Sequence, residues 1–234
     1  MSQSHLLDNL ELMHAETLAL LSTAARLDDA SITAPSLCEG WTRAHVVTHI
    51  ARNADAICNL VHWATTGEPT PMYASPESRD ADIAEGARRP AADQVADLVA
   101  SAARLAEMAP SLAGAPEDRE VEMRGGRVVP GRDLPTLRLR EVVFHHVDLD
   151  LGYTFADADA GFVERTLRRA VATLADSPAA PSLRLRSDEG DVWSVGDGAT
   201  YVTGTRAGLL LWLARGVPDG VSSDGSLPPV PPWG

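Results

Sequence analysis

Lysine is absent from this chain of 234 residues, and all 20 of its basic residues are arginine. Without a lysine amine the protein cannot form a Schiff base with a carbonyl substrate, and it has no P-loop lysine for a nucleotide phosphate. Acidic residues number 33, so the formal net charge is −13. Nucleic acids and anionic membranes both need a cationic protein face. The composition therefore argues against both as partners.

Cysteine is scarce, because only Cys38 and Cys58 occur. Two cysteines are too few for a disulfide scaffold or a structural zinc knuckle, and we expect a reduced, cytoplasmic protein. No apolar run approaches the roughly 18 residues that a membrane span needs. The N-terminal stretch lacks a basic region and a cleavage site of small residues, so no signal peptide is expected.

Apolar residues that recur at three- and four-residue steps predict four helices in the first part of the chain. These helices cover residues of about 4–28, 42–65, 91–109 and 133–151. Thr42 is placed to cap the second helix and Gly67 to end it. Residues 68–83 contain three prolines and predict an ordered loop between the second and third helices. Four helices with mostly modest connections predict a bundle.

The sequence changes character in its last third. An amphipathic helix is predicted over residues 160–176. Short runs of alternating polarity then predict three strands, over residues 182–187, 191–196 and 200–205. A last helix is predicted over residues 206–216, and Gly216 is expected to end it.

Two domains are therefore expected. Residues 1–154 form a four-helix bundle and residues 155–234 a small α+β domain, so the predicted fold class is mainly α with an α+β C-terminal part. No exposed apolar stripe stands out in the sequence, and a monomer is expected.

A row of polar residues interrupts the predicted fourth helix, whose other side chains are mostly large and apolar. At about 100° per residue, Arg138, Glu141, His145 and Asp148 fall on one narrow sector. Burying an unpaired charge is costly, so this row needs partners. It is explained either by an ion-pair ladder, with Glu141 bonded to His145 one turn away, or by a bound metal ion. His146 points roughly 100° away from His145 and is interpreted as structural or solvent-facing.

The predicted second helix can complete a metal site. His49 lies at the edge of its apolar stripe, where a lone histidine is more often a hydrogen-bonded core residue than a ligand. Together with Glu141 and His145, however, His49 supplies two imidazoles and one carboxylate from two helices. Catalytic zinc commonly takes three such ligands and leaves a fourth position open. Arg138 and Asp148 would then lie behind the ligands and orient them.

Three longer stretches carry a resemblance to a known family. They read EGWTRAHVVTHIARNADAICNLVHWATTGEPTPMYASPESRDADI from residue 39, REVVFHHVDLDLG from residue 140, and AGLLLWLARGVPDGVSS from residue 207. Over nearly its whole length the chain resembles the mycothiol-dependent maleylpyruvate isomerases, whose N-terminal domain is a DinB-like four-helix bundle. The first stretch is long and specific, and it outweighs any short motif.

The resemblance implies a divalent metal, normally zinc (Zn2+), held by His49, Glu141 and His145. It also implies that Arg215, near the end of the last helix, is needed for activity. The family reaction is the cis–trans isomerisation of maleylpyruvate to fumarylpyruvate, a step after ring opening in gentisate breakdown. The implied partners are a small dicarboxylate substrate and mycothiol, whose thiol adds reversibly to the double bond. The ligand set alone leaves iron, cobalt and manganese open.

Two arginines are candidates for binding the substrate carboxylates. Arg215 can hold a carboxylate in a bidentate fork and stabilise an enolate, although a cation at a helix end also complements the helix dipole. Arg79, in the proline-rich segment, is either a second carboxylate-binding residue or a solvated loop arginine. Cys58 falls near the apolar stripe of the second helix and is expected to be a buried apolar residue rather than a nucleophile.

Two other functions remain open from the sequence. One is a mycothiol S-transferase, which would use the same metal site on another electrophile. The other is a non-enzymatic metal-binding or anti-sigma-like regulatory module, which would need neither a thiol nor a reaction. Because related DinB-like bundles differ widely in reaction, the fold alone does not distinguish these functions.

Overall fold

The computed structural model describes residues 3–231 of the chain. The chain divides into two compact units, residues 1–151 and residues 152–234. The first two and the last three residues of the predicted domains, 1–2 and 232–234, lie outside the described residues. In the part of the chain that is described, no helix combines the length and the apolar character needed to cross a membrane.

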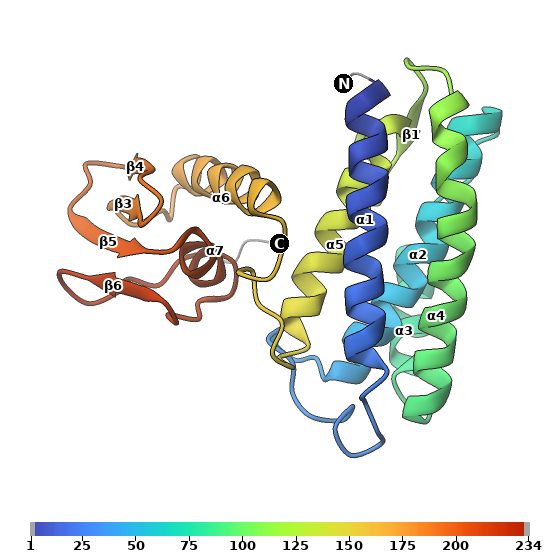
Figure 1. Ribbon diagram of the computed structural model, residues 1–234, viewed down its shortest axis with the longest axis horizontal. Helices are drawn as coiled ribbons and strands as arrows, with labels where there is room; N and C mark the ends of the chain where they lie inside the picture. The colour runs from blue at the N-terminus through green and yellow to red at the C-terminus, as the bar shows by residue number, and fades with distance from the viewer. Residues whose placement is uncertain (1–2, 232–234) are drawn as a thin grey trace. The chain divides into compact units, whose positions relative to one another are not determined.

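The first unit is a bundle of four long helices with one shorter helix beside it (Figure 1). The long helices are α1 (Gln3–Ala24), α2 (Arg43–Thr66), α4 (Ala91–Met108) and α5 (Leu134–Asp148). Helix α2 packs against both α4 and α5, while α1 packs against α5 and α4. The expected bundle is therefore confirmed, and its four helices are those that the apolar periodicity predicts.

The ends of α2 follow the predicted capping. Thr42 is the N-cap in an extended conformation, and its backbone N–H donates to Nδ1 of His45 at 3.3 Å. Gly67 ends the helix with a φ of 84°, and its N–H donates to the carbonyl of Trp63. This left-handed backbone favours glycine, which is why the helix stops there.

A shorter helix, α3 (Pro76–Gly86), shows that the prediction of a loop over residues 68–83 is wrong in its second half. The hydroxyl of Ser75 accepts from the backbone N–H of Ser78 at 3.1 Å, and the Ser78 hydroxyl accepts from the backbone N–H of Ser75 at 3.0 Å. Pro76 is in the first turn, where its missing N–H needs no partner. This reciprocal capping overrides the prolines and places Arg79 on a helix that packs against α2.

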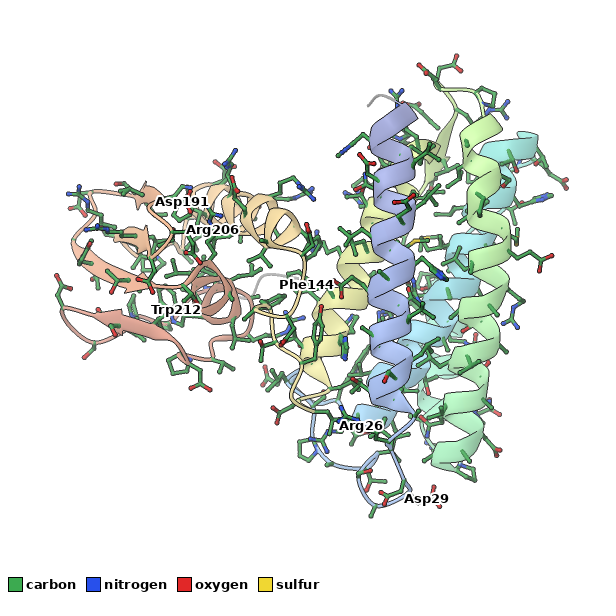
Figure 2. All side chains as sticks on the ribbon, in the orientation of Figure 1. Arg26, Asp29, Phe144, Asp191, Arg206 and Trp212 are labelled. Atoms are coloured by element: carbon green, nitrogen blue, oxygen red, sulfur yellow. The ribbon has the colours of Figure 1, made fainter. Side chains whose placement is uncertain are left out.

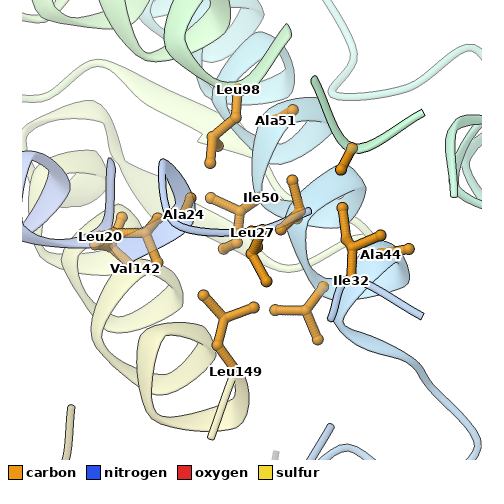
Figure 3. Packing of buried hydrophobic residues seen from close by; sticks show 13 residues of the cluster. Leu20, Ala24, Leu27, Ile32, Ala44, Ile50, Ala51, Leu98, Val142 and Leu149 are labelled. Atoms are coloured by element: carbon orange, nitrogen blue, oxygen red, sulfur yellow. The ribbon is translucent and has the colours of Figure 1, made fainter. Parts of the chain in front are cut away.

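Apolar side chains from all four long helices form the core of the first unit (Figure 3). Leu20 of α1, Ile50 of α2, Leu98 of α4 and Val142 of α5 are almost completely buried in it. Burying one side chain of this size contributes about 1.5–3 kcal/mol. The shared core fixes α2 relative to α5, the two helices on which the sequence places candidate metal ligands.

A small antiparallel hairpin lies between α4 and α5 in the sequence. Strands β1 (Glu120–Glu122) and β2 (Val128–Pro130) form the hairpin. Each of these two strands is only three residues long. The 3-10 helix η1 (Ala109–Gly114) precedes it, and the 3-10 helix η2 (Gly131–Asp133) follows it. Gly131 is required where the hairpin meets α2, because a Cβ there would lie 2.6 Å from the Cβ of Ala64.

The second unit contains two helices and a four-stranded sheet (Figure 1). Its elements are α6 (Ala160–Ala175), β3 (Leu183–Ser187), β4 (Val192–Val195), β5 (Thr200–Gly204), α7 (Arg206–Arg215) and β6 (Val221–Ser223). The strand order is β4-β3-β5-β6, with β3 and β5 parallel and the other pairs antiparallel. The three predicted strands are confirmed, and β6, only three residues long, was not predicted.

Helix α7 is fixed at both ends. At its start, Nε of Arg206 donates to the carboxylate of Asp191 at 2.6 Å (Figure 2). At its end, Gly216 has a φ of 69° and stops the helix, as predicted. With this unit in place, the predicted fold class, a helical bundle followed by a small α+β part, is confirmed.

Candidate metal centre

The polar residues on one face of α5 lie next to α2. Glu141 and His145 are one turn apart on α5 and therefore project from the same face. His49 comes from the second turn of α2, and the packing of α2 against α5 brings its ring to them. His49 is buried, whereas the side chain of Glu141 is 35% exposed. The cluster therefore has a closed side and an open side.

The three side chains converge on one oxygen atom. Oε2 of Glu141 is 3.1 Å from Nε2 of His49 and 3.7 Å from Nε2 of His145. The two imidazole rings meet edge to face, with centroids 4.7 Å apart. One donor atom from each residue lies within 4.8 Å of the others. The structure thus brings together the three residues that the sequence singled out.

An ion-pair ladder along α5 describes this arrangement poorly. The separation of 3.7 Å between Glu141 and His145 is longer than a hydrogen bond. The nearer partner of Glu141 is His49, on the other helix. The carboxylate is thus shared between two helices rather than paired along one.

Asp148 orients the ring of His145. This carboxylate is completely buried, and it accepts a hydrogen bond from Nδ1 of His145 at 2.8 Å. The proton of the neutral imidazole is then on Nδ1, and Nε2 keeps its lone pair. That lone pair and the Glu141 carboxylate are both acceptors, yet they face the same space. A cation there would satisfy both, and carboxylates commonly orient metal-binding histidines in this way.

Arg138 holds the two helices together beside the cluster. Its side chain is fully buried, and its Nη1 donates to the carbonyl of Ile50 at 3.0 Å and to Oδ1 of Asn53 at 2.6 Å. Burial lowers the pKa of Arg138 to about 10, so the guanidinium remains charged at neutral pH. This charge in turn helps to lower the pKa of Glu141.

The protonation states of the cluster suit a divalent metal. Burial by itself raises the pKa of Glu141, but the hydrogen bond from His49 and nearby positive charges outweigh it and bring the pKa to about 2. Burial lowers the pKa of His49 to about 4, although the bond to Glu141 acts in the opposite direction. At neutral pH the carboxylate is therefore charged and the His49 ring is neutral, as metal ligands must be. The donor set fits zinc.

A second group of donors lies behind His145. Sγ of Cys38 is 3.1 Å from Oδ2 of Asp148 and 3.8 Å from Nδ1 of His145. These three residues are also close enough to hold a metal. Here, however, Oδ2 of Asp148 is already within hydrogen-bonding distance of both Nδ1 of His145 and Sγ of Cys38, so these groups are paired with one another. The side of His145 that faces Glu141 is the better metal position.

Trp41 and Arg79 border the cluster. The ring of Trp41 lies 5.4 Å from that of His49 and 6.4 Å from that of His145, centroid to centroid. Nη2 of Arg79 is 3.3 Å from Nδ1 of His49, and its Cζ lies 5.9 Å from the centre of the Tyr73 ring. Arg79 is therefore not a solvated loop residue. Trp41 and Tyr73 were not singled out from the sequence; the only signal was that Trp41 directly precedes the cap of α2, where side chains often fold back over the first turn.

His146 and Cys58, which were predicted to be structural residues, lie apart from the candidate ligands. His146 is buried, with its Nε2 2.8 Å from the hydroxyl of Thr23 on α1, so the structural interpretation holds and the solvent-facing one is wrong. Cys58 is also buried, and burial raises the pKa of its thiol to about 11. A thiol that stays protonated is a poor nucleophile, as expected of a buried apolar residue.

Arg215 belongs to the second unit. It is the last residue of α7, it is half-buried, and its Nη1 donates to the carbonyl of Ala214 at 2.9 Å. Its place at a helix C-terminus suits the helix dipole. A role for Arg215 in activity stays a prediction.

A family model and two solved structures point to the same family. A family model described as the mycothiol maleylpyruvate isomerase N-terminal domain matches residues 13–150, which include all three candidate ligands. Two solved structures are similar over the full length, one described as the mycothiol-dependent maleylpyruvate isomerase and one as a histidine-to-alanine variant of it. Each is 33% identical, covers 100% of both chains and has a TM-score of 0.87. The comparison with curated proteins gives no match.

The ligand assignment can be tested by metal retention. After loading with one equivalent of zinc and gel filtration, the parent protein should keep the metal. His49→Ala and His145→Ala should each lose most of it, because only two ligands remain. His146→Asn is the matched control, since His146 neighbours His145 in sequence but contacts Thr23. Full zinc retention in folded His49→Ala and His145→Ala would rule out this ligand set.

Proposed function

The chain belongs to the mycothiol maleylpyruvate isomerase family, and we propose that it isomerises maleylpyruvate to fumarylpyruvate with mycothiol as cosubstrate. The observation that carries the proposal is the cluster of His49, Glu141 and His145, in a chain similar over its full length to a structure described as that enzyme. We further propose that the protein is a cytoplasmic monomer and that its reaction is a step in gentisate breakdown.

His49, Glu141 and His145 are proposed to hold a zinc ion, with the open side of the cluster left for a thiol. A zinc ion bound there would lower the pKa of that thiol, as zinc does for bound water. Two features of the chain support this. Burial holds His49 in the neutral form, and Asp148 keeps the proton of His145 on Nδ1.

Isomerisation requires that the carbon–carbon double bond become a single bond for a time. The thiolate of mycothiol forms a carbon–sulfur bond at the conjugated double bond, and the π electrons move to the pyruvyl oxygen as an enolate. After rotation the electrons return, the carbon–sulfur bond breaks and the thiolate leaves. The thiol is regenerated, so no oxidant, reductant or cysteine of the protein is consumed.

The substrate is a small dianion, and the enolate adds negative charge on an oxygen. Cationic side chains must therefore accompany the cluster. Arg79 is proposed to bind one carboxylate, which its contact with the His49 ring supports. Arg215 is proposed to hold the other carboxylate in a bidentate fork and to stabilise the enolate, as the family resemblance implies.

The cysteines of the protein should be dispensable. In Cys38→Ser/Cys58→Ala, serine keeps a donor for Asp148 and alanine keeps an apolar side chain in the core. We expect turnover of maleylpyruvate close to the parent rate in this variant, and no turnover of either protein when mycothiol is omitted.

The same assay separates the competing functions. Turnover without mycothiol, or its loss in a folded, zinc-loaded double variant, would contradict the proposal. Mycothiol-dependent reaction of another electrophile, with maleylpyruvate inert, would identify an S-transferase. Zinc binding without any reaction would identify a regulatory module.

Replacing Arg215 tests the contribution of the second unit. Arg215→Ala should stay folded and retain zinc but lose roughly a hundredfold or more in kcat, the typical effect of removing a cation or donor from a developing oxyanion. Arg215→Lys should recover little, because an ammonium lacks the planar fork. Arg168→Ala, an exposed arginine of α6, is the control. A rate for Arg215→Ala within about threefold of the parent would show that Arg215 does not act on the substrate.

A further inference from the structure

A groove lies between α1 and α4, which run side by side in the bundle (Figure 1). Its volume is about 570 Å³, within the range of about 300–1,000 Å³ that is typical of small-molecule sites. Leucine and methionine side chains of α1 form one wall, and mainly small side chains of α4 form the other. None of the three candidate metal ligands lines it. The groove is therefore a second concave site, separate from the candidate metal centre.

Small side chains on α4 leave this space open. Ala102, Ala103 and Ala106 line the groove opposite the leucines of α1, where larger side chains would close the gap between the helices. Leu18 of α1 and Val99 of α4 also line it and are 53% and 46% exposed. Large apolar side chains exposed around a concave apolar surface are typical of a ligand-binding groove. These walls favour a ligand with an aliphatic part.

A charged side chain lies at the bottom of this apolar groove. Arg138 of α5 lines it, although only 1% of the residue is exposed. Its Nη1 donates to two neutral groups, the carbonyl of Ile50 and the side chain of Asn53, while its Nε has no partner among the described residues. Glu141 attracts this charge through space, without forming an ion pair in the described part of the chain. Buried charges are normally paired, and an anion at Nε would pair this one.

We propose that this groove binds a free aliphatic carboxylate of the medium-chain fatty acid type, with its carboxylate at Arg138 and its tail between α1 and α4. The apolar walls bury the tail, and Nε donates to the carboxylate in a charge-assisted hydrogen bond. The carboxylate reaches the buried guanidinium by a local shift of side chains. Met13, which is buried and also lines the groove, has the flexible, unbranched side chain that such a shift needs.

The charges of the groove distinguish this ligand from others. A neutral lipid or an apolar helix would leave Nε of Arg138 unpaired, and a cation would be repelled by the guanidinium. An anionic membrane surface would meet the exposed Glu11, which also lines the groove, and a chain with a net charge of −13. A slim ligand with a single negative charge fits both the apolar walls and the buried cation. The inference does not depend on zinc or maleylpyruvate, so its failure would leave the proposed function intact.

Calorimetric titration with decanoate, at concentrations below those at which it forms micelles, tests the ligand class. One decanoate should bind per chain, about tenfold or more tightly than decanol, which is the usual gain from a hydrogen bond to a charged group. In protein with 13C-labelled methionine methyl groups, decanoate should shift the resonance of Met13. The resonance of Met72 should stay unchanged, because its sulfur contacts the backbone of Arg124 in the hairpin instead of the groove.

Three variants test the location. Ala106 is exposed and lines the groove, so the indole of Ala106→Trp should occupy the space of the tail and weaken decanoate binding about tenfold or more. Ala100→Trp is the matched control, since Ala100 is an exposed residue of α4 that does not line the groove. It should bind decanoate like the parent. Arg138→Met removes the donor, so a folded variant should no longer prefer decanoate to decanol. The two tryptophan variants keep the test valid if Arg138→Met does not fold.

Selective decanoate binding that is lost in Ala106→Trp and kept in Ala100→Trp supports the proposal. Equal affinity for decanoate and decanol, or a Met13 resonance that does not move, overturns it. Equal weakening by both tryptophan substitutions also overturns it, because decanoate then binds elsewhere. A dimer in sedimentation experiments that Ala106→Trp dissociates and decanoate does not would place a second copy of the chain in the groove, which likewise contradicts the proposal.

Discussion

The negative charge of Glu141 is the constraint on which the rest of the candidate centre depends. Its carboxylate comes from one helix and accepts a hydrogen bond from His49 on another, with His145 at 3.7 Å. Burial alone would raise the pKa of such a group and favour the neutral form, which is a poor metal ligand. The surrounding donors and the buried guanidinium of Arg138 reverse this effect. The packing of α2 against α5 therefore positions the ligands and also keeps the central one charged.

Two further contacts position the histidine rings around this carboxylate. Asp148 is fully buried, and its carboxylate lies 2.8 Å from Nδ1 of His145. Helix α3 packs against α2 and brings Nη2 of Arg79 to 3.3 Å from Nδ1 of His49. Each ring is therefore held on the side away from Glu141 by a charged side chain, which leaves both Nε2 atoms directed toward the carboxylate.

Much of this centre was predictable because a helix has a fixed period. A step of about 100° per residue places Glu141, His145 and Asp148 on one face whatever the rest of the fold. The contacts that depend on distant segments were not predictable in this way. Cys38 lies 110 residues from Asp148 in the sequence, and Arg79 lies 30 residues from His49. Three prolines concealed the reciprocal capping of α3, and β1 and β6 are too short, at three residues each, for alternation to be recognised.

X-ray absorption at the zinc edge, on zinc-loaded protein without mycothiol, tests the central claim most directly. The claim is that the metal is bound by His49, Glu141 and His145, on the side of His145 that faces away from the thiol of Cys38. The account predicts a first shell of nitrogen and oxygen only, at about 2.0–2.2 Å. A sulfur ligand at about 2.3 Å would place the metal on Cys38, His145 and Asp148 and would contradict the account.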